Sequence, residues 1–295
     1  MLCIAAEAQA MLKTEDIGIR DPFVLPVAEE IRYYLYGTTR AMPDGQGGPC
    51  FEAYTSSDLK EWEGPIRVFG ASTGFWGTKT YWAPEVHRYR GKYYLFGTFS
   101  SDTRRRACHI LVSDGPRGPF KPLTNRPITP HGWQCLDGTL FVDDDGKPWI
   151  LFCREWEQVG DGEICALRLT DGLKYPLGKP IVLFRASEAQ WVNRGATYVT
   201  DGPFLHRANE GRLLMLWSSF GIGGYTQGVA RSESGQITGP WRQEADPLFA
   251  EDGGHGMVFR TFEGELMLVL HAPNGGPTRP RFISVREKDA GLVRK

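Results

Sequence analysis

The chain has 295 residues, of which 41% are hydrophobic and 23% are charged, so enough core-forming side chains are present to exclude a globally disordered chain. Lys and Arg (34) almost balance Asp and Glu (35), and the formal charge of -1 creates no field that would collect nucleic acid or an anionic membrane. The 36 Gly and 20 Pro argue against long helices, whereas 9 Trp, 11 Tyr and 16 Phe suit an all-β core or a sugar-stacking cleft.

The cysteines and the N-terminus bear on the compartment. The six cysteines are scattered without a C-x-x-C pair, which predicts reduced thiols. No segment approaches the roughly 20 consecutive apolar residues of a membrane-spanning helix. Residues 1–10 are small and apolar and end in Ala-Gln-Ala, which is compatible with the remnant of a signal peptide. The sequence therefore leaves open both a cytoplasmic and a periplasmic or secreted location.

Five similar segments recur along the chain, each a turn followed by a strand of apolar and aromatic residues. They cover residues 31–37, 91–97, 146–152, 211–217 and 264–270, and their starts lie 60, 55, 65 and 53 residues apart. Four of them begin with a glycine, which supplies the positive φ that a tight hairpin turn requires. A further strand, ending in Ser and followed by a turn and an aromatic residue, is indicated within residues 53–62, 111–120 and 229–241.

This period predicts an all-β fold, namely a five-bladed β-propeller with blades of about four antiparallel strands. The repeats use up the chain, and no linker divides it. We therefore expect a single domain over residues 1–295, with residues 1–13 as an N-terminal extension.

One polar residue precedes each repeated hairpin strand, at the start of an otherwise apolar segment. These residues are Asp21, Glu85, Asp137, Asp201 and His255. An aspartate before Pro or Gly is most often a turn residue, but turns do not need a polar residue in every repeat. If each segment is the innermost strand of its blade, the five side chains converge on the propeller axis. Burying several carboxylates around one axis is costly, so the arrangement indicates chemistry or a bound cation.

In this order the motifs resemble those of glycoside hydrolase family 43, which consists of inverting glycosidases on a five-bladed propeller. The resemblance extends over residues 19–271. It rests on the motifs Arg20-Asp21-Pro22, Tyr81-Trp82-Ala83-Pro84-Glu85-Val86, Leu136-Asp137-Gly138, Asp201-Gly202-Pro203 and Gly253-Gly254-His255-Gly256.

The resemblance implies a catalytic role for each of three aspartates. Asp21 is the expected general base, Asp201 the general acid, and Asp137 the carboxylate that orients the acid and raises its pKa. An inverting reaction needs the acid and the base about 6.5–9.5 Å apart, and opposite sides of a propeller axis provide such a spacing. The family usually has Glu where this chain has Asp201, so the acid is one methylene, about 1.5 Å, shorter.

The motifs also predict binding roles for three further residues. We expect Trp82 and Glu85 to contact substrate, with Trp82 stacking on a sugar face; ordinary blade packing is the alternative for Trp82. The resemblance also implies a possible structural calcium ion near His255. Calcium prefers six to eight oxygen ligands, so water would have to complete such a site. The chemistry itself is expected to need no cofactor.

Three classes of function remain open from the sequence. The first is an exo-acting hydrolase of α-L-arabinofuranosides in plant cell-wall arabinan or arabinoxylan. The second is a β-D-xylosidase or a galactosidase that uses the same site. The third is a non-catalytic propeller that binds glycans. In each case the expected partner is a plant oligosaccharide or polysaccharide, and neither nucleic acid nor a membrane.

Overall fold

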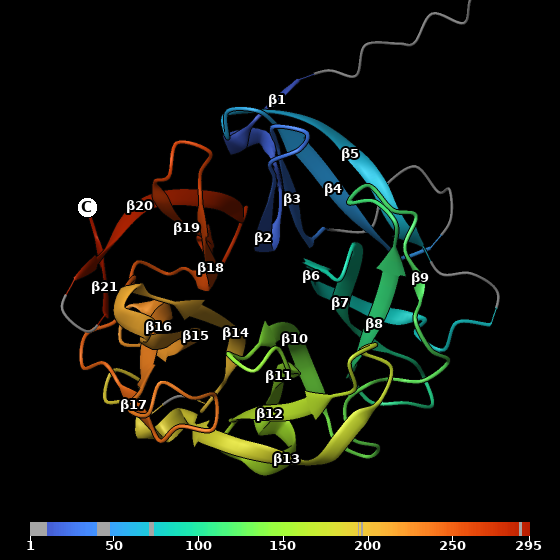
Figure 1. The fold of residues 1–295 in the computed structure, drawn as a ribbon. Helices are drawn as coiled ribbons and strands as arrows, with labels where there is room; N and C mark the ends of the chain where they lie inside the picture. The colour runs from blue at the N-terminus through green and yellow to red at the C-terminus, as the bar shows by residue number, and fades with distance from the viewer. Residues whose placement is uncertain (1–10, 40–47, 71–73, 194, 196, 289–290) are drawn as a thin grey trace, which may run out of the picture.

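Five antiparallel sheets surround a central axis in the computed structural model, as Figure 1 shows. The structure describes residues 11–39, 48–70, 74–193, 195, 197–288 and 291–295, so residues 1–10, the segment compatible with a signal-peptide remnant, lie outside it. Within this described part, four sheets have four strands and the first has five. The predicted five-bladed β-propeller is confirmed.

The strands of each blade follow one another in sequence from the axis outward (Figure 1). Blade one has β2 (Arg20–Val27), β3 (Arg32–Thr38), β4 (Cys50–Ser56), β5 (Glu61–Gly70) and, at its outer edge, β1 (Leu12–Lys13). Blade two has β6 (Lys79–Tyr89), β7 (Lys92–Ser100), β8 (Ala107–Ser113) and β9 (Lys121–Pro122). Blade three has β10 (Cys135–Val142), β11 (Pro148–Arg154), β12 (Glu163–Leu169) and β13 (Pro176–Arg185). Blade four has β14 (Asp201–Arg207), β15 (Leu213–Gly221), β16 (Gly224–Ser232) and β17 (Trp241–Gln243). Blade five has β18 (Gly254–Arg260), β19 (Leu266–Ala272), β20 (Arg279–Lys288) and β21 (Gly291–Arg294).

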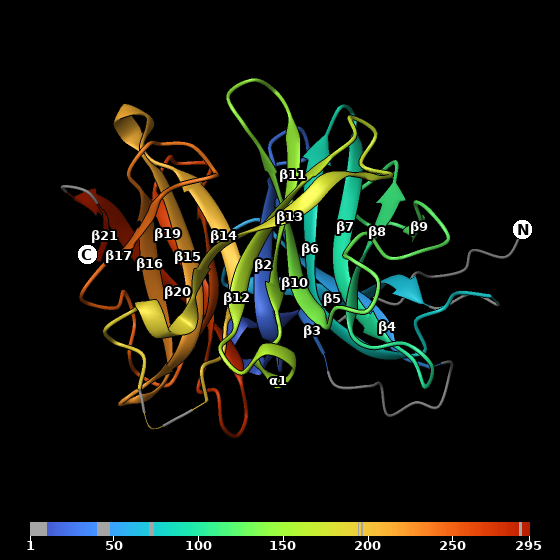
Figure 2. The same cartoon turned by 90° about the horizontal axis from the view of Figure 1, so that it is seen from below.

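Among the residues that the structure describes, helical structure is confined to short segments between strands. These are α1 (Trp156–Val159) and the 3-10 turns η1 (Thr14–Asp16), η2 (Ala186–Glu188) and η3 (Asn209–Gly211). No described helix has the length and apolar character needed to cross a membrane. Figure 2 shows that the strands run roughly along the propeller axis, so the turns gather at its two ends.

The predicted repeat segments form the second strand of each blade. Their turn glycines have φ values of 78° (Gly91), 72° (Gly146), 76° (Gly211) and 85° (Gly264), which confirms the hairpin prediction. In blade one the aromatic residues that mark the repeat are buried, because Tyr33, Tyr34 and Tyr36 are at most 2% exposed. The core lies between neighbouring blades, where these strands pack against one another.

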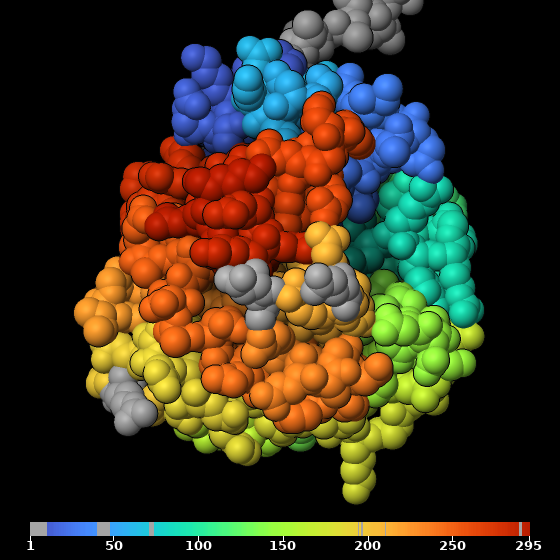
Figure 3. Space-filling view, turned by 60° about the vertical axis from the view of Figure 1, so that its left-hand side comes forward, coloured from blue at the N-terminus to red at the C-terminus, as the bar shows by residue number. Residues whose placement is uncertain are grey.

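The ring closes where blade five meets blade one, as the space-filling view in Figure 3 shows for the outer surface. A hydrogen bond joins blade five to the segment before blade one's inner strand here, because Arg279 Nε of β20 donates to Glu15 O of η1 at 2.7 Å. In addition, β1 pairs with β5 through Leu12 and Lys13, so the last two residues of the expected N-terminal extension form part of blade one. Cys108, Cys135, Cys153 and Cys165 are free thiols, as expected.

Candidate active site

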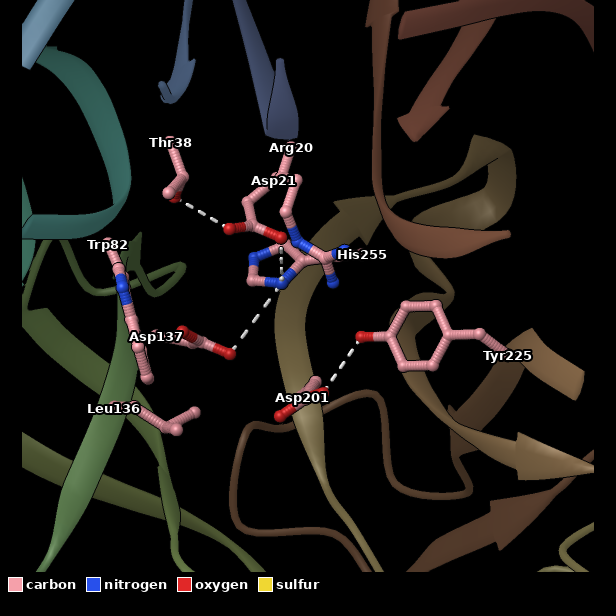
Figure 4. A pocket seen from close by; sticks show the side chains of 9 residues that line it. All are labelled: Arg20, Asp21, Thr38, Trp82, Leu136, Asp137, Asp201, Tyr225 and His255. Carbon is pink, nitrogen blue, oxygen red and sulfur yellow. Dashed lines mark hydrogen bonds and ion pairs between the residues drawn. The ribbon is translucent and has the colours of Figure 1, made fainter. Parts of the chain in front are cut away.

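A cavity of about 380 Å³ opens at the propeller axis, and side chains from all five blades line it (Figure 4). The innermost strands provide most of this lining, and β3 and β16 add one residue each. The lining residues are Arg20, Asp21, Thr38, Trp82, Leu136, Asp137, Asp201, Tyr225 and His255. The structure thus brings together the three predicted catalytic aspartates, Trp82 and His255.

Each inner strand has a register shift near the axis, and a residue with positive φ lies within it. The five residues and their φ values are Asp21 (51°), Ala83 (44°), Asp137 (57°), Gly202 (50°) and His255 (51°). Such a bulge bends the strand and re-aims its side chain. In blades one, three and five the bulge residue itself, Asp21, Asp137 or His255, points into the cavity. In blade four the bulge residue is Gly202, and the side chain in the cavity is that of the preceding residue, Asp201 (Figure 4).

This register corrects the expected position of Glu85. In blade two Ala83 occupies the bulge, and Glu85 lies farther along β6, where it is paired with Phe96 of β7. Glu85 is only 8% exposed, and its Oε2 lies 3.0 Å from His87 Nε2. Glu85 is therefore not among the residues that line the cavity.

Asp21 is held in a setting that favours its ionised form. Thr38 Oγ1 donates a hydrogen bond to its Oδ2 at 2.6 Å, and His255 Nδ1 lies 3.3 Å from its Oδ1. Burial opposes ionisation, but the positive charges of His255 and Arg20 and the bond from Thr38 outweigh it, so the pKa of Asp21 lies below its ordinary value. Asp21 is thus an ionised carboxylate at neutral pH.

The backbone N–H of Asp21 fixes the state of His271. This N–H donates to His271 Nδ1 at 3.0 Å, so the proton of the ring lies on Nε2, 3.3 Å from Asn274 Oδ1. Burial lowers the pKa of His271 to about 4. The ring is therefore neutral, and its approach to the Asp21 carboxylate is not an ion pair.

The other two aspartates have pKa values above the ordinary aspartate value. Burial is the main cause for both, and it raises the pKa of Asp137 well above its ordinary value and that of Asp201 less strongly. The charges of Asp201 and Asp21 add to the effect at Asp137, against the opposing charge of His255. Gly202 N–H donates to Asp137 Oδ2 at 3.0 Å, and Tyr225 Oη donates to Asp201 Oδ2 at 2.9 Å.

His255 lies within this group of carboxyls. Its Nδ1 lies 3.3 Å from Asp21 Oδ1 and 3.7 Å from Asp137 Oδ2. Burial lowers the pKa of His255, but the charges of Asp21, Asp137 and Asp201 outweigh this effect and raise it above its ordinary value. The pocket therefore combines a carboxyl whose pKa is lowered, Asp21, with two whose pKa values are raised, and general acid–base chemistry uses such a difference.

A profile of one protein family covers the pocket and all five blades, because it matches residues 17–287. The chain belongs to glycosyl hydrolases family 43. The motif resemblance is confirmed, and the chain is a glycosidase. Its fold is similar to that of a solved endo-arabinase from Bacteroides thetaiotaomicron VPI-5482, with 45% identity, a TM-score of 0.87, and 95% of this chain and 98% of that chain covered.

Curated relatives of this family 43 glycosidase include an arabinofuranosidase and an arabinanase. One is an extracellular exo-alpha-(1->5)-L-arabinofuranosidase from Cellvibrio japonicus (strain Ueda107), 22% identical, with 88% of this chain and 80% of that protein covered. The other is an extracellular endo-alpha-(1->5)-L-arabinanase 1 from Bacillus subtilis (strain 168), 27% identical, with 80% of this chain and 71% of that protein covered.

The family 43 glycosidase has no described cluster that suits the expected calcium ion. Among the described residues, no group of three or more His, Cys, Asp or Glu side chains could hold a metal. Calcium prefers six to eight oxygens, whereas His255 offers a nitrogen that already faces two carboxyls. The calcium ion that the resemblance implied is therefore not confirmed.

Trp82 lies at the mouth of the pocket, where its side chain can meet substrate. It is 39% exposed, in contrast to Trp62 and Trp217, which are fully buried between blades. The guanidinium of Arg106 lies over its ring, 5.5 Å from the centroid, and also pairs with Glu155 at 2.7 Å. Trp82 is thus held in place from one side and remains open on the other.

Sequence reasoning missed several residues of the pocket. Arg20 stands beside Asp21 in the first motif, so its position was the available signal. Its guanidinium donates to Asn274 O at 2.9 Å and Asn274 Oδ1 at 2.7 Å, which fixes it in the pocket wall. Thr38 and Tyr225 come from outside the motifs and carry no comparable signal.

Proposed function

We propose that this family 43 glycosidase hydrolyses α-L-arabinofuranosidic linkages with inversion of configuration. Asp21 acts as general base and Asp201 as general acid, and Asp137 tunes and orients the acid. One observation carries the proposal: in the same cavity the pKa of Asp21 is lowered, while that of Asp201 is raised. General acid–base hydrolysis by two carboxyls uses an ionised base, a protonated acid and no cofactor.

The proposed reaction proceeds in one displacement. Asp21 accepts a proton from water as the water oxygen attacks the anomeric carbon. The bond between that carbon and the leaving oxygen breaks, its electron pair stays on the oxygen, and Asp201 donates the proton that neutralises it. Asp21 is then protonated and Asp201 ionised, and exchange with solvent restores both.

Asp137 and His255 support this assignment of acid and base. The ring of His255, whose pKa is raised, lies against Asp21, and its protonated form stabilises the ionised form of Asp21. Asp137 accepts the backbone N–H of Gly202, the residue after Asp201, which ties the two aspartates together. Burial and mutual repulsion oppose a second negative charge in this pair.

The relatives support arabinofuranosides as substrate. The three arabinan-acting proteins described above share the fold or the sequence of this chain over most of its length. The exposed face of Trp82 is available to stack on a sugar. We expect the natural substrate to be a plant oligosaccharide or polysaccharide such as arabinan.

Exo action is supported by the size of the cavity. Its volume of about 380 Å³ is near the lower end of the roughly 300–1,000 Å³ of ligand pockets. Such a cavity suits a terminal sugar better than the middle of a polymer. Endo action is the second candidate, because the 45% identical solved structure is described as an endo-arabinase.

The test combines a substrate panel with analysis of products. Aryl α-L-arabinofuranosides, β-D-xylosides and β-D-galactosides are compared, and proton NMR identifies the anomer that forms first. We expect arabinofuranoside hydrolysis with inversion. A preference for xyloside or galactoside would reject the substrate, and retention would reject the mechanism. Linear arabinan distinguishes the two modes, since exo action releases only arabinose at early times and endo action releases a ladder of oligosaccharides.

A further inference from the structure

The general acid proposed above is unusually short, and the pocket contains a side chain that can compensate for its length. Asp201 has a reach about 1.5 Å shorter than a glutamate at the same position. Tyr225 lies opposite on β16, is only 2% exposed, and donates from Oη to Asp201 Oδ2 at 2.9 Å (Figure 4). This contact fixes the direction of the Asp201 carboxyl.

The ring of Tyr225 is itself held on several sides. It stacks on His271, with ring centroids 5.4 Å apart and an interplanar angle of 13°. The ring centroid of Phe220 lies 5.4 Å from that of Tyr225. On another side, a Cβ added at Gly254 would lie only 2.8 Å from Cε1 of Tyr225. Its backbone N–H donates to Asp252 Oδ1 at 3.2 Å. The hydroxyl is therefore presented from a fixed position, so the hydrogen bond costs little conformational entropy.

The same stack connects the acid to the base. His271 Nδ1 accepts the backbone N–H of Asp21 at 3.0 Å, and its Nε2–H faces Asn274 Oδ1 at 3.3 Å. The path from Asp201 through Tyr225 and His271 to Asp21 thus consists of two hydrogen bonds and one ring stack. These contacts connect the carboxyl of Asp201 to the backbone of Asp21.

We propose that Tyr225 is a positioning residue that holds the short acid Asp201 in its productive orientation. The phenol donates to Oδ2, so the transferable proton of the neutral acid lies on Oδ1, which is left free to face the leaving oxygen. Stacking on His271 keeps this orientation in register with Asp21. The inference rests on the proposed role of Asp201 as general acid.

The test compares Tyr225→Phe with wild type on aryl glycosides whose leaving groups range from dinitrophenol to phenol. Proton donation matters in proportion to how poor the leaving group is. We expect kcat on the phenyl glycoside to fall by about three- to tenfold, the range of one hydrogen bond. The dinitrophenyl glycoside should lose less than about twofold, with KM little changed.

Tyr36→Phe is the matched control. Tyr36 is also buried, and its hydroxyl donates to Pro116 O at 2.7 Å, outside the pocket. Its loss should lower the melting temperature without changing the dependence of kcat on the leaving group. In a background of Asp201→Glu, whose longer side chain places its carboxyl elsewhere, Tyr225→Phe should cost less than about twofold.

Several outcomes would overturn the inference. Equal losses on both leaving groups, no loss, or a crystal structure of Tyr225→Phe with an unmoved Asp201 carboxyl would each do so. Asp201→Ala separates this failure from failure of the proposed function. If Asp201→Ala shows the leaving-group dependence and Tyr225→Phe does not, only the role of Tyr225 is wrong. If neither shows it, the assignment of the acid is wrong as well. Should another aryl glycoside be the better substrate, the same series is measured on it.

Discussion

Replacing Gly202 by Ala tests whether the strand bulge and the pocket depend on each other. Gly202 occupies the bulge position of blade four, with φ of 50°. A Cβ there would lie 2.6 Å from Cδ2, 2.8 Å from Cγ and 3.0 Å from Nε2 of His255. The ring of His255 must therefore move, and this movement would disturb its contact with Asp21, whose Oδ1 lies 3.3 Å from Nδ1 of the ring.

The expected loss of unfolding free energy has two parts. A non-glycine residue in the left-handed region costs about 1–2 kcal/mol, and overpacking against a buried ring adds about 1–3 kcal/mol. Gly202→Ala should thus lower the unfolding free energy by about 2–5 kcal/mol. Because displacing a catalytic group by about 1 Å can cost on the order of 100-fold, we expect kcat to fall at least tenfold.

Urea denaturation and kcat measurement check both numbers, with Gly146→Ala as the control. Gly146 has φ of 72°, and a Cβ there would meet no atom within 4 Å, so it isolates the backbone contribution. It should cost about 1–2 kcal/mol and leave kcat unchanged. If Gly202→Ala were no more destabilising than Gly146→Ala and kept wild-type kcat, the tight packing of His255 against blade four would be refuted.

Four further predictions concern the proposed catalytic groups. Asp21→Asn should lower kcat by about 100-fold or more with an unchanged melting temperature, since a general base contributes about 10²–10⁴; more than a tenth of wild-type kcat would reject the base. Trp82→Ala should raise KM more than it lowers the melting temperature, whereas a stability loss with unchanged kinetics would indicate a packing role. Asp201→Ala should damage hydrolysis of arabino-oligosaccharides far more than that of a nitrophenyl arabinofuranoside, and equal damage would point to a structural role. The pH profile of kcat/KM should be bell-shaped. Its acid limb should lie below the ordinary aspartate pKa, because the pKa of Asp21 is lowered, and its alkaline limb above it, because that of Asp201 is raised; a profile without an alkaline limb would contradict Asp201 as the acid.

The blade count and the order of strands were predictable from the sequence. Each repeat contains a hairpin whose turn needs a residue with positive φ. A glycine at that place in the sequence, as at Gly146 and Gly264, therefore indicates the turn. The aromatic and apolar residues after the turn indicate a strand that is buried between blades. Both signals are local, so they survive without knowledge of the tertiary structure.

The positions of the pocket residues were only partly predictable. Asp137 and His255 each precede their turn glycine by nine residues, and Asp201 precedes Gly211 by ten. Glu85 precedes Gly91 by only six, so the spacing already set it apart. The pairing of β6 with β7 then decided that Ala83 occupies the bulge and that Glu85 lies outside the pocket lining.

Only the tertiary structure decided the charge state of the carboxyls and the contacts that hold them. Burial is the largest effect on Asp137 and Asp201, and burial depends on all five blades closing around the axis. Tyr225 reaches Asp201 because the hairpin of β15 and β16 extends beyond the pairing of Asp201 with Ser218. The motifs of the sequence thus identified most of the charged residues of the site. The pKa shifts and orientations of those residues depend on side chains that meet only because the blades bring distant parts of the chain together.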